Sequence, residues 1–222
     1  MNNFLSIKDL EYYYQDGDAR RYIFKDLNYE FEKGTFYAIL GESGSGKTTL
    51  LSILSGMDTQ TSGSVEFNGK SIKEIGLNTY RRNNVGMVFQ SYNLIPYMSA
   101  YENLLTAMDI TDNVISDQSD VAYNLLDFLG VTKTKADRSV TKLSGGEQQR
   151  VAITRALATN VDLILADEPT GNLDTKTELA IVETFRLLAN EHDKCVIVVT
   201  HSQGVAKYAD VVINLSNGDD NE

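Results

Sequence analysis

The chain has 222 residues, which suits one large domain or a core with a subdomain and is enough to bury a hydrophobic core. Its 20 Lys and Arg stand against 31 Asp and Glu, for a formal net charge of −11. This acidic balance argues against a nucleic-acid-binding protein and against direct docking on an anionic membrane, so that any membrane association would depend on a protein partner.

The first third of the chain has the patterns of β-strands. Apolar and other residues alternate from Leu10 to Tyr14, and residues 36–40 form a short apolar run. Asn68-Gly69 separates two strand-like segments and is a typical hairpin turn.

A phosphate-binding pattern, G-x-x-x-x-G-K-[ST], follows the run at 36–40 and is matched at every fixed position. Its glycines permit positive φ and close backbone approach, so that successive N–H groups can surround phosphate oxygens. We expect Lys47 to reach the β- and γ-phosphates of a nucleotide and the Thr48 hydroxyl to hold Mg²⁺. A helix is predicted from Thr49 to Ser55, directly after the loop. Because a phosphate loop is normally followed by a helix, a glycine-rich turn that matches the pattern by chance is the weaker interpretation. The predicted loop residues are Gly41, Glu42, Ser43, Gly44, Ser45, Gly46, Lys47 and Thr48.

The middle of the chain, roughly 91–155, is predicted to be mainly helical. Within it, Val121, Leu125, Phe128 and Leu129 form an apolar face that stops at the next glycine. This spacing is typical of an amphipathic helix.

A second glycine pair lies in the segment 143–150, LSGGEQQR. Ser144 and Glu147 fit a capping box, which places Gly145 and Gly146 in the first turn of a helix. Free N–H groups and the positive end of the helix dipole at such a start attract an anion such as phosphate. The sequence therefore contains two predicted phosphate-binding segments.

Two adjacent carboxylates, Asp167 and Glu168, end the apolar strand predicted at 163–166. Ligands gather at the carboxyl ends of parallel strands, so we expect the pair to face the same crevice as the phosphate loop. Asp167 is placed to hold Mg²⁺, and Glu168 is the candidate general base for the attacking water. The alternative is a solvated surface pair, which rarely follows four apolar residues.

Two further polar residues follow apolar strands. His201 comes after the run at 196–200, whose end should also reach the crevice, whereas His192 in a polar turn is interpreted as structural. Gln90 follows the run at 85–89, and its neutral amide is able to contact both Mg²⁺ and water.

Strands and helices alternate in the last third of the chain. The strand at 163–166 precedes a helix around 179–189, and a strand at 196–199 follows. This order implies a parallel sheet covered by helices on both faces.

The single cysteine, Cys195, excludes an intrachain disulfide and fits a reducing compartment. It begins an apolar run and is interpreted as a small buried strand residue. No run approaches the ~18 apolar residues of a spanning helix, and the first residues lack the features of a signal peptide, so we expect a cytosolic chain.

With these motifs in place, the chain resembles the nucleotide-binding subunit of an ABC transporter over nearly its whole length. Residues 41–49, with Thr49 as the last, are similar to the Walker A loop, 143–150 to the signature motif and 163–168 to Walker B. The same resemblance makes Gln90 the Q-loop glutamine, Asp174 the D-loop aspartate and His201 the H-loop histidine.

The resemblance also points to an aromatic residue that stacks on adenine. Tyr14 aligns best with it, while Tyr12 and Tyr13 stay open as alternatives, and one face of an edge strand is the structural interpretation. Ser202 departs from the pattern, since many relatives carry an acidic residue after the histidine, and we expect it to change the hydrogen bonding of that loop.

The fold implied by the resemblance is α/β. It has a P-loop NTPase core with a mainly parallel sheet, an N-terminal antiparallel β subdomain and an inserted helical subdomain. We expect one ABC ATPase domain over 1–222, with the ATP-binding core and β subdomain at about 1–90 and 156–222 and the helical signature subdomain at about 91–155.

The resemblance further implies ATP as substrate, Mg²⁺ as cofactor and a head-to-tail dimer. Ser144, Gly145 and Gly146 would then contact the γ-phosphate held by another copy. Glu147 is also an implied nucleotide-binding residue. A homodimer is expected, and a different ATPase as partner stays open. The implied catalytic residues are Glu168, His201, Lys47 and Gln90, the nucleotide contacts include Asp174, and the metal-binding residues are Thr48, Gln90 and Asp167.

A separate integral membrane permease is the other implied partner, and it would hold the chain on the cytoplasmic face of the membrane. Residues 92–98 would line a groove for a permease helix, although Leu94 and Ile95 suit the core of the subdomain equally well. Segments 85–104 and 167–174 resemble the branch with macrolide exporters, lipoprotein-releasing ATPases and peptide-detoxification modules. A regulatory ATPase whose permease-like partner moves no substrate is the alternative, and the cargo stays open.

Overall fold

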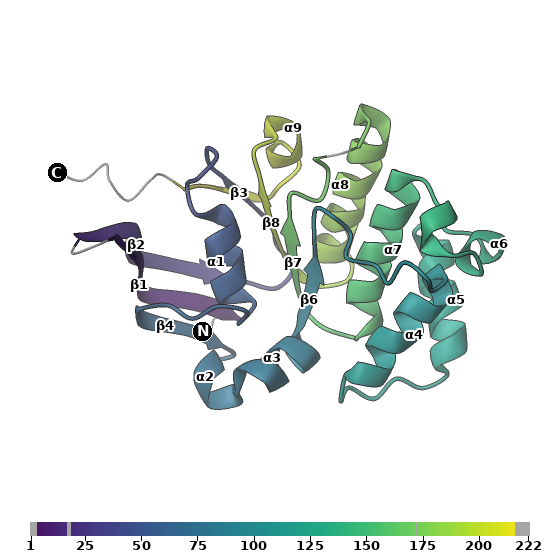
Figure 1. The fold of residues 1–222 in the computed structure, drawn as a ribbon, viewed down its shortest axis with the longest axis horizontal. Coiled ribbons are helices and arrows are strands. Elements are labelled where there is room, and N and C mark those ends of the chain that lie inside the picture. The colour runs from purple at the N-terminus through teal and green to yellow at the C-terminus, as the bar shows by residue number, and fades with distance from the viewer. Residues whose placement is uncertain (1–3, 17–18, 172, 216–222) are drawn as a thin grey trace.

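The computed structural model describes residues 4–16, 19–171 and 173–215, which form two β-sheets and the helices around them (Figure 1). An antiparallel sheet has the strand order β2-β1-β4-β5, and a parallel sheet has the order β6-β7-β8-β3-β9. The predicted α/β class is confirmed. The strands are β1 (Leu5–Asp16), β2 (Ala19–Phe31), β3 (Phe36–Leu40), β4 (Ser62–Phe67), β5 (Lys70–Ser71), β6 (Val85–Val88), β7 (Leu163–Asp167), β8 (Cys195–Thr200) and β9 (Val211–Asn214).

Alternate residues of the central strands point to opposite faces of the parallel sheet, and both faces are covered. Leu163 and Leu165 of β7 belong to a core shared with the antiparallel sheet and with α1 (Lys47–Leu54). Ile164 and Ala166 instead pack with α8 (Thr175–Asn190). Burial on two sides explains why the strands read as continuous apolar runs.

A third core holds the helical segment together. The helices α4 (Ala100–Ile110), α5 (Gln118–Phe128) and α6 (Lys133–Ala136) pack with α7 (Gly145–Ala158) around Leu104, Leu126 and Val151. On α7, Ile153 lies in the core that packs against the parallel sheet. The helix α7 therefore connects the helical segment to the parallel sheet. The remaining helices are α2 (Ile72–Ile75), α3 (Leu77–Asn84), a 3₁₀ turn (Val140–Lys142) and α9 (Gln203–Ala206).

The buried face of α5 differs from the predicted one. Ala122 and Leu126 are fully buried, whereas Phe128, placed on the apolar face by its spacing, is 50% exposed. The Phe128 ring stands edge-on against the His192 ring, with centroids 5.7 Å apart. The small Ala122 side chain allows close packing against the neighbouring helices, which apolar spacing alone does not reveal.

Two helices begin earlier than predicted. The helix α1 starts at Lys47 instead of Thr49, and α8 starts at Thr175 instead of near Leu179. Both first turns are polar, so apolar periodicity misses them, and in α8 the Asp174 carboxylate caps the start. The predicted hairpin is confirmed, since Asn68 and Gly69 connect β4 to β5 with positive φ.

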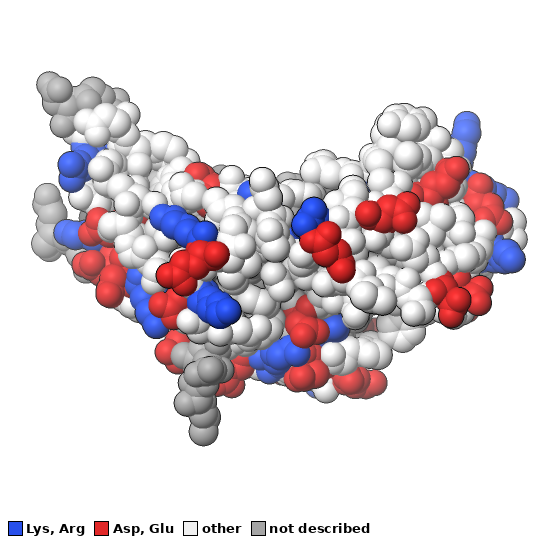
Figure 2. Space-filling model, turned by 90° about the horizontal axis from the view of Figure 1, so that it is seen from below, with Lys and Arg blue, Asp and Glu red and all other residues white. Residues whose placement is uncertain are grey.

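The surface mixes both signs of charge. On the face in Figure 2, Lys and Arg are interspersed with Asp and Glu along the whole length of the molecule. Charged side chains of opposite sign also pair, as do Lys8 and Glu66 at 2.7 Å. Across the described ranges, none of the helices combines the length and apolar character needed to cross a membrane.

Candidate functional site

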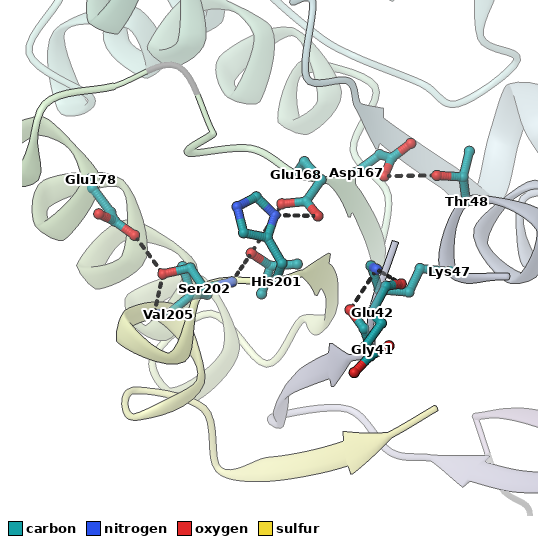
Figure 3. A network of polar contacts seen from close by, with 11 residues as sticks. Gly41, Glu42, Lys47, Thr48, Asp167, Glu168, Glu178, His201, Ser202 and Val205 are labelled. Carbon is teal, nitrogen blue, oxygen red and sulfur yellow. Dashed lines mark hydrogen bonds and ion pairs between the residues drawn. The ribbon is translucent and has the colours of Figure 1, made fainter. Parts of the chain in front are cut away.

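Parallel register brings three strand ends to one edge of the sheet. Leu40 of β3 lies beside Thr200 of β8, and Asp167 of β7 lies beside Val199. The loop that starts at Gly41, and the residues Glu168 and His201, therefore emerge side by side (Figure 3). This is the crevice expected from the sequence, built at the carboxyl ends of parallel strands.

The loop between β3 and α1 depends on its glycines. Gly44 and Gly46 have φ of 86° and 89°, a region that side chains with a Cβ rarely adopt. A Cβ on Gly46 would also lie 2.5 Å from Cγ2 of Ile23. The main chain thus curves around the N-terminus of α1, where free N–H groups and the helix dipole favour an anion.

The Lys47 side chain lies across this loop and is 9% exposed. Its ammonium group donates to the carbonyl oxygens of Gly41 at 2.7 Å and of Glu42 at 2.8 Å. A cation is therefore held at the mouth of the loop by neutral acceptors. Such contacts are exchangeable for phosphate oxygens, which bind an ammonium group more strongly.

Two oxygen ligands meet beside the loop. The Thr48 hydroxyl donates to Oδ1 of Asp167 at 3.4 Å. Burial raises the pKa of the Asp167 carboxyl and the neighbouring Glu168 adds to this effect, while the bond from Thr48 opposes it. A hydroxyl and a carboxylate that can share one cation are a donor set that fits Mg²⁺, whose remaining ligands are usually water and phosphate.

Both carboxylate oxygens of Glu168 have partners at the end of β8. Nδ1 of His201 lies 2.9 Å from Oε1, and the Thr200 hydroxyl donates to Oε2 at 3.2 Å. The Glu168 backbone has a positive φ of 44°. Residue spacing predicts that Glu168 and His201 share the crevice but not that they touch.

Lys47, Thr48, Glu168 and His201 line a cavity of about 710 Å³ at the strand ends. Most of the predicted nucleotide-binding residues of the phosphate loop contribute to its wall, and Ile23 of β2 is a further wall residue that the sequence did not single out. The lining residues are Tyr14, Ile23, Ser43, Gly44, Gly46, Lys47, Thr48, Thr49, Glu168 and His201.

The three candidate tyrosines have different surroundings. Tyr14 lies on the cavity wall and is 51% exposed. Tyr12 donates its hydroxyl to Asp58 at 2.7 Å, and Tyr13 packs against the ring of Tyr22. Of these three side chains, only that of Tyr14 offers a ring to the cavity.

Gln90 lies in the turn after β6, outside the cavity lining. Its Nε2 approaches Gly171, so closely that a Cβ there would lie 3.1 Å away. The following residues, Tyr92 and Asn93, both have positive φ, and the guanidinium of Arg155 on α7 donates to their carbonyl oxygens. The loop after Gln90 is therefore attached to α7.

The predicted capping box at the start of α7 is confirmed. The Ser144 hydroxyl accepts from the N–H of Glu147 at 3.4 Å, and the Glu147 carboxylate accepts from the N–H of Ser144 at 2.8 Å. An ion pair with Lys135 at 2.7 Å, together with that backbone bond, lowers the pKa of Glu147. Glu147 thus builds the helix start, and its predicted contact with nucleotide stays a prediction.

The starts of α7 and α8 lie against each other. A Cβ on Gly146 would come within 2.5 Å of Cγ2 of Thr177 in the first turn of α8. Asp174 caps α8 by accepting from the hydroxyl and N–H of Thr177 and from the N–H of Lys176, and these bonds lower its pKa. Its predicted role at the nucleotide also stays a prediction.

Ser202, the departure noted in the sequence, forms specific bonds of its own. Its hydroxyl donates to Oε1 of Glu178 on α8 at 2.9 Å and accepts from the N–H of Val205 (Figure 3). The loop after His201 is therefore fastened to α8 by a neutral hydroxyl.

Comparison with known proteins defines the family. The family model described as "ABC transporter" matches residues 24–171. The uncharacterized ABC transporter ATP-binding protein YclH of Bacillus subtilis is 45% identical over 96% of this chain and 94% of its own length. The macrolide export ATP-binding/permease protein MacB of Bdellovibrio bacteriovorus is 39% identical over 96% of this chain, which spans 33% of that longer protein.

A solved structure agrees with these sequence relationships. The dimeric, post-hydrolysis ATP-binding cassette MJ0796, bound to ADP and Pi, is 36% identical and has a TM-score of 0.86 over 96% of this chain and 95% of its own. Fold and phosphate loop together define a P-loop nucleotide-binding protein. The chain belongs to the ABC transporter family, as an ATP-binding subunit with ATPase activity.

The position of Tyr14 generates a prediction about ATP affinity. Tyr14→Ala removes the aromatic ring from the cavity wall and should weaken ATP binding by about 5- to 100-fold, the range expected for loss of stacking on a base. Tyr13→Ala is the matched control, since its ring packs on Tyr22 outside the cavity. Equilibrium binding of a fluorescent ATP analogue measures both, and equal affinities for the two variants would contradict the prediction.

Proposed function

We propose that two copies of this chain bind ATP and Mg²⁺ head to tail, each nucleotide lying between the phosphate loop of one copy and the α7 start of the other. The observation that carries the proposal is that the phosphate loop and the α7 start of one chain lie apart from each other. Lys47 and Glu168 line the cavity, whereas no residue of 143–150 does so among those the structure describes. In Figure 1, α1 and α7 lie on opposite sides of the strands β6, β7 and β8.

The phosphate loop and the groups beside it bind ATP and Mg²⁺. Lys47 exchanges the carbonyl oxygens of Gly41 and Glu42 for β- and γ-phosphate oxygens, and the loop N–H groups hold the remaining oxygens. Thr48 and Asp167 would hold Mg²⁺, which when bound neutralises negative charge on the phosphates. Tyr14 covers the adenine.

Hydrolysis requires an activated water and a fixed base. As the water oxygen bonds to the γ-phosphorus and the bond to the bridging oxygen breaks, Glu168 accepts the water proton. His201 contacts the carboxylate at 2.9 Å and, with its side chain 70% exposed, is free to turn toward the γ-phosphate. Gln90, one loop away, senses the metal and water when that loop moves.

A separate membrane permease is the proposed recipient of this cycle, with the ATPase bound to its cytoplasmic side. The name of MacB joins an ATP-binding part and a permease in one protein, and this chain matches a third of it. Tyr97, in the loop before α4, is 81% exposed and offers an aromatic contact. Leu94 by contrast packs against the core of the helical segment, which is the alternative to a permease contact that its sequence position left open.

The general-base assignment predicts that Glu168→Gln binds ATP but loses most turnover. Removing a positioned base costs about 10²- to 10⁴-fold in rate. Glu183→Gln, on the exposed side of α8, is the control and should keep wild-type activity. Phosphate release under saturating ATP is the measurement, and steady-state turnover of Glu168→Gln near wild type refutes the assignment.

Action across subunits predicts that Ser144→Arg spares nucleotide binding but abolishes the ATP-dependent dimer. The added side chain would occupy the space at the α7 start that the proposed partner's phosphate fills. Ser99→Ala is the control, because it removes an equivalent capping box, with Glu102, from α4. Sedimentation in the Glu168→Gln background, with ATP, reports the dimer, and normal dimers of Ser144→Arg would rule out the trans arrangement.

The permease contact predicts an effect of Tyr97→Asp that appears only in cells. The isolated variant should hydrolyse ATP normally, yet its recovery in the membrane fraction of cells that make the native permease should fall at least about fivefold, since a buried aromatic anchor often carries over 1 kcal/mol of binding energy. Val114→Asp is the control at another exposed position, 88% accessible. Equal membrane recovery of both variants and wild type would count against this surface.

A further inference from the structure

The residue before the histidine has a hydroxyl that no step above uses. Thr200 ends β8 and is fully buried. Its Oγ1 donates to Oε2 of Glu168 at 3.2 Å and accepts from the N–H of Ser202 at 3.0 Å. Because the Ser202 N–H can only donate, it occupies an acceptor position on Oγ1, and the Thr200 proton is left for the carboxylate.

The two partners of Glu168 differ in their freedom to move. His201 is a surface side chain, 70% exposed, and is therefore free to turn toward a ligand. Thr200 is enclosed within the sheet, and the register of β7 and β8 fixes its position, since the N–H of Glu168 donates to the carbonyl of Val199 at 2.9 Å. The β-branching of Thr200 further restricts its χ1 orientations.

Glu168 itself needs to be held. Its φ of 44° is in the left-handed region, which costs a residue with a Cβ on the order of 1–3 kcal/mol and persists only where surrounding contacts impose it. A base that accepts a proton from water must also keep one oxygen in a fixed place to within about 0.5 Å.

We propose that Thr200 is a positioning residue for hydrolysis, whose buried hydroxyl fixes Oε2 of Glu168 so that Oε1 is presented to the attacking water when His201 turns to the phosphate. The inference rests on the proposed role of Glu168 as base. It assigns the two residues at the end of β8 different tasks, the buried Thr200 holding the base in every state and the exposed His201 exchanging partners.

The test uses the full chain with Thr200→Val, which keeps the shape and burial of the side chain and removes the hydroxyl. We expect kcat to fall about tenfold, the scale of a lost charge-assisted hydrogen bond, with KM and the affinity for ATP within about twofold of wild type. Thr200→Ser restores the donor and should recover most of kcat. A purely structural role would instead lower the melting temperature and the ATP affinity along with the rate.

Ser202→Ala separates positioning of the base from loosening of the loop. It breaks the bond to Glu178 but leaves the Thr200 hydroxyl on Glu168, and its kcat should remain within about twofold of wild type. If Ser202→Ala loses as much activity as Thr200→Val, order in the loop is the cause and the proposal fails.

Glu168→Gln, measured beside these variants, distinguishes a failure of the role proposed for Thr200 from a failure of the role proposed for Glu168. If it loses turnover while Thr200→Val keeps the wild-type kcat, Thr200 has no positioning role and the function of Glu168 stands. If Glu168→Gln hydrolyses ATP normally, the base assignment falls and the inference about Thr200 falls with it.

Discussion

The parallel pairing of β3, β7 and β8 is the constraint on which the site depends. It places Leu40 beside Thr200 and Asp167 beside Val199, so that a cation-bearing loop and a carboxylate pair meet without any direct sequence proximity. Burial on both faces constrains this register, because a shift by one residue would move each apolar side chain of β7 from its own core into the opposite one. Stability and chemistry therefore depend on the same strands.

Charge in the crevice is arranged before any ligand enters. Lys47 is held by the carbonyl oxygens of Gly41 and Glu42, which are neutral acceptors, and its charge also acts to lower the pKa of the Asp167 carboxyl. Asp167 and Glu168 stand at the end of β7, close enough for their mutual repulsion to contribute to the raised pKa of Asp167. An anion with a bound divalent cation would place negative charge beside the ammonium group and positive charge beside the two carboxylates.

Features set by local sequence could be predicted, and features set by packing could not. The phosphate loop, the Asn68-Gly69 hairpin and the capping box of Ser144 follow from turn and cap chemistry within a few residues. The contact of Glu168 with Thr200 joins residues far apart in the chain and needs the strand register. The position of Tyr14 on the cavity wall, and the exposure of Phe128, likewise depend on which elements lie opposite.

The attachment of the Gln90 loop to α7 has a mechanical consequence. Arg155 holds the carbonyl oxygens of Tyr92 and Asn93, and it stands on the same helix of 14 residues that Ser144 caps. A helix of that length moves as a rigid rod of about 21 Å. In the proposed dimer, a displacement of this loop beside one nucleotide would shift the helix end that faces the other nucleotide, so that the Arg155 guanidinium would help to couple the two sites.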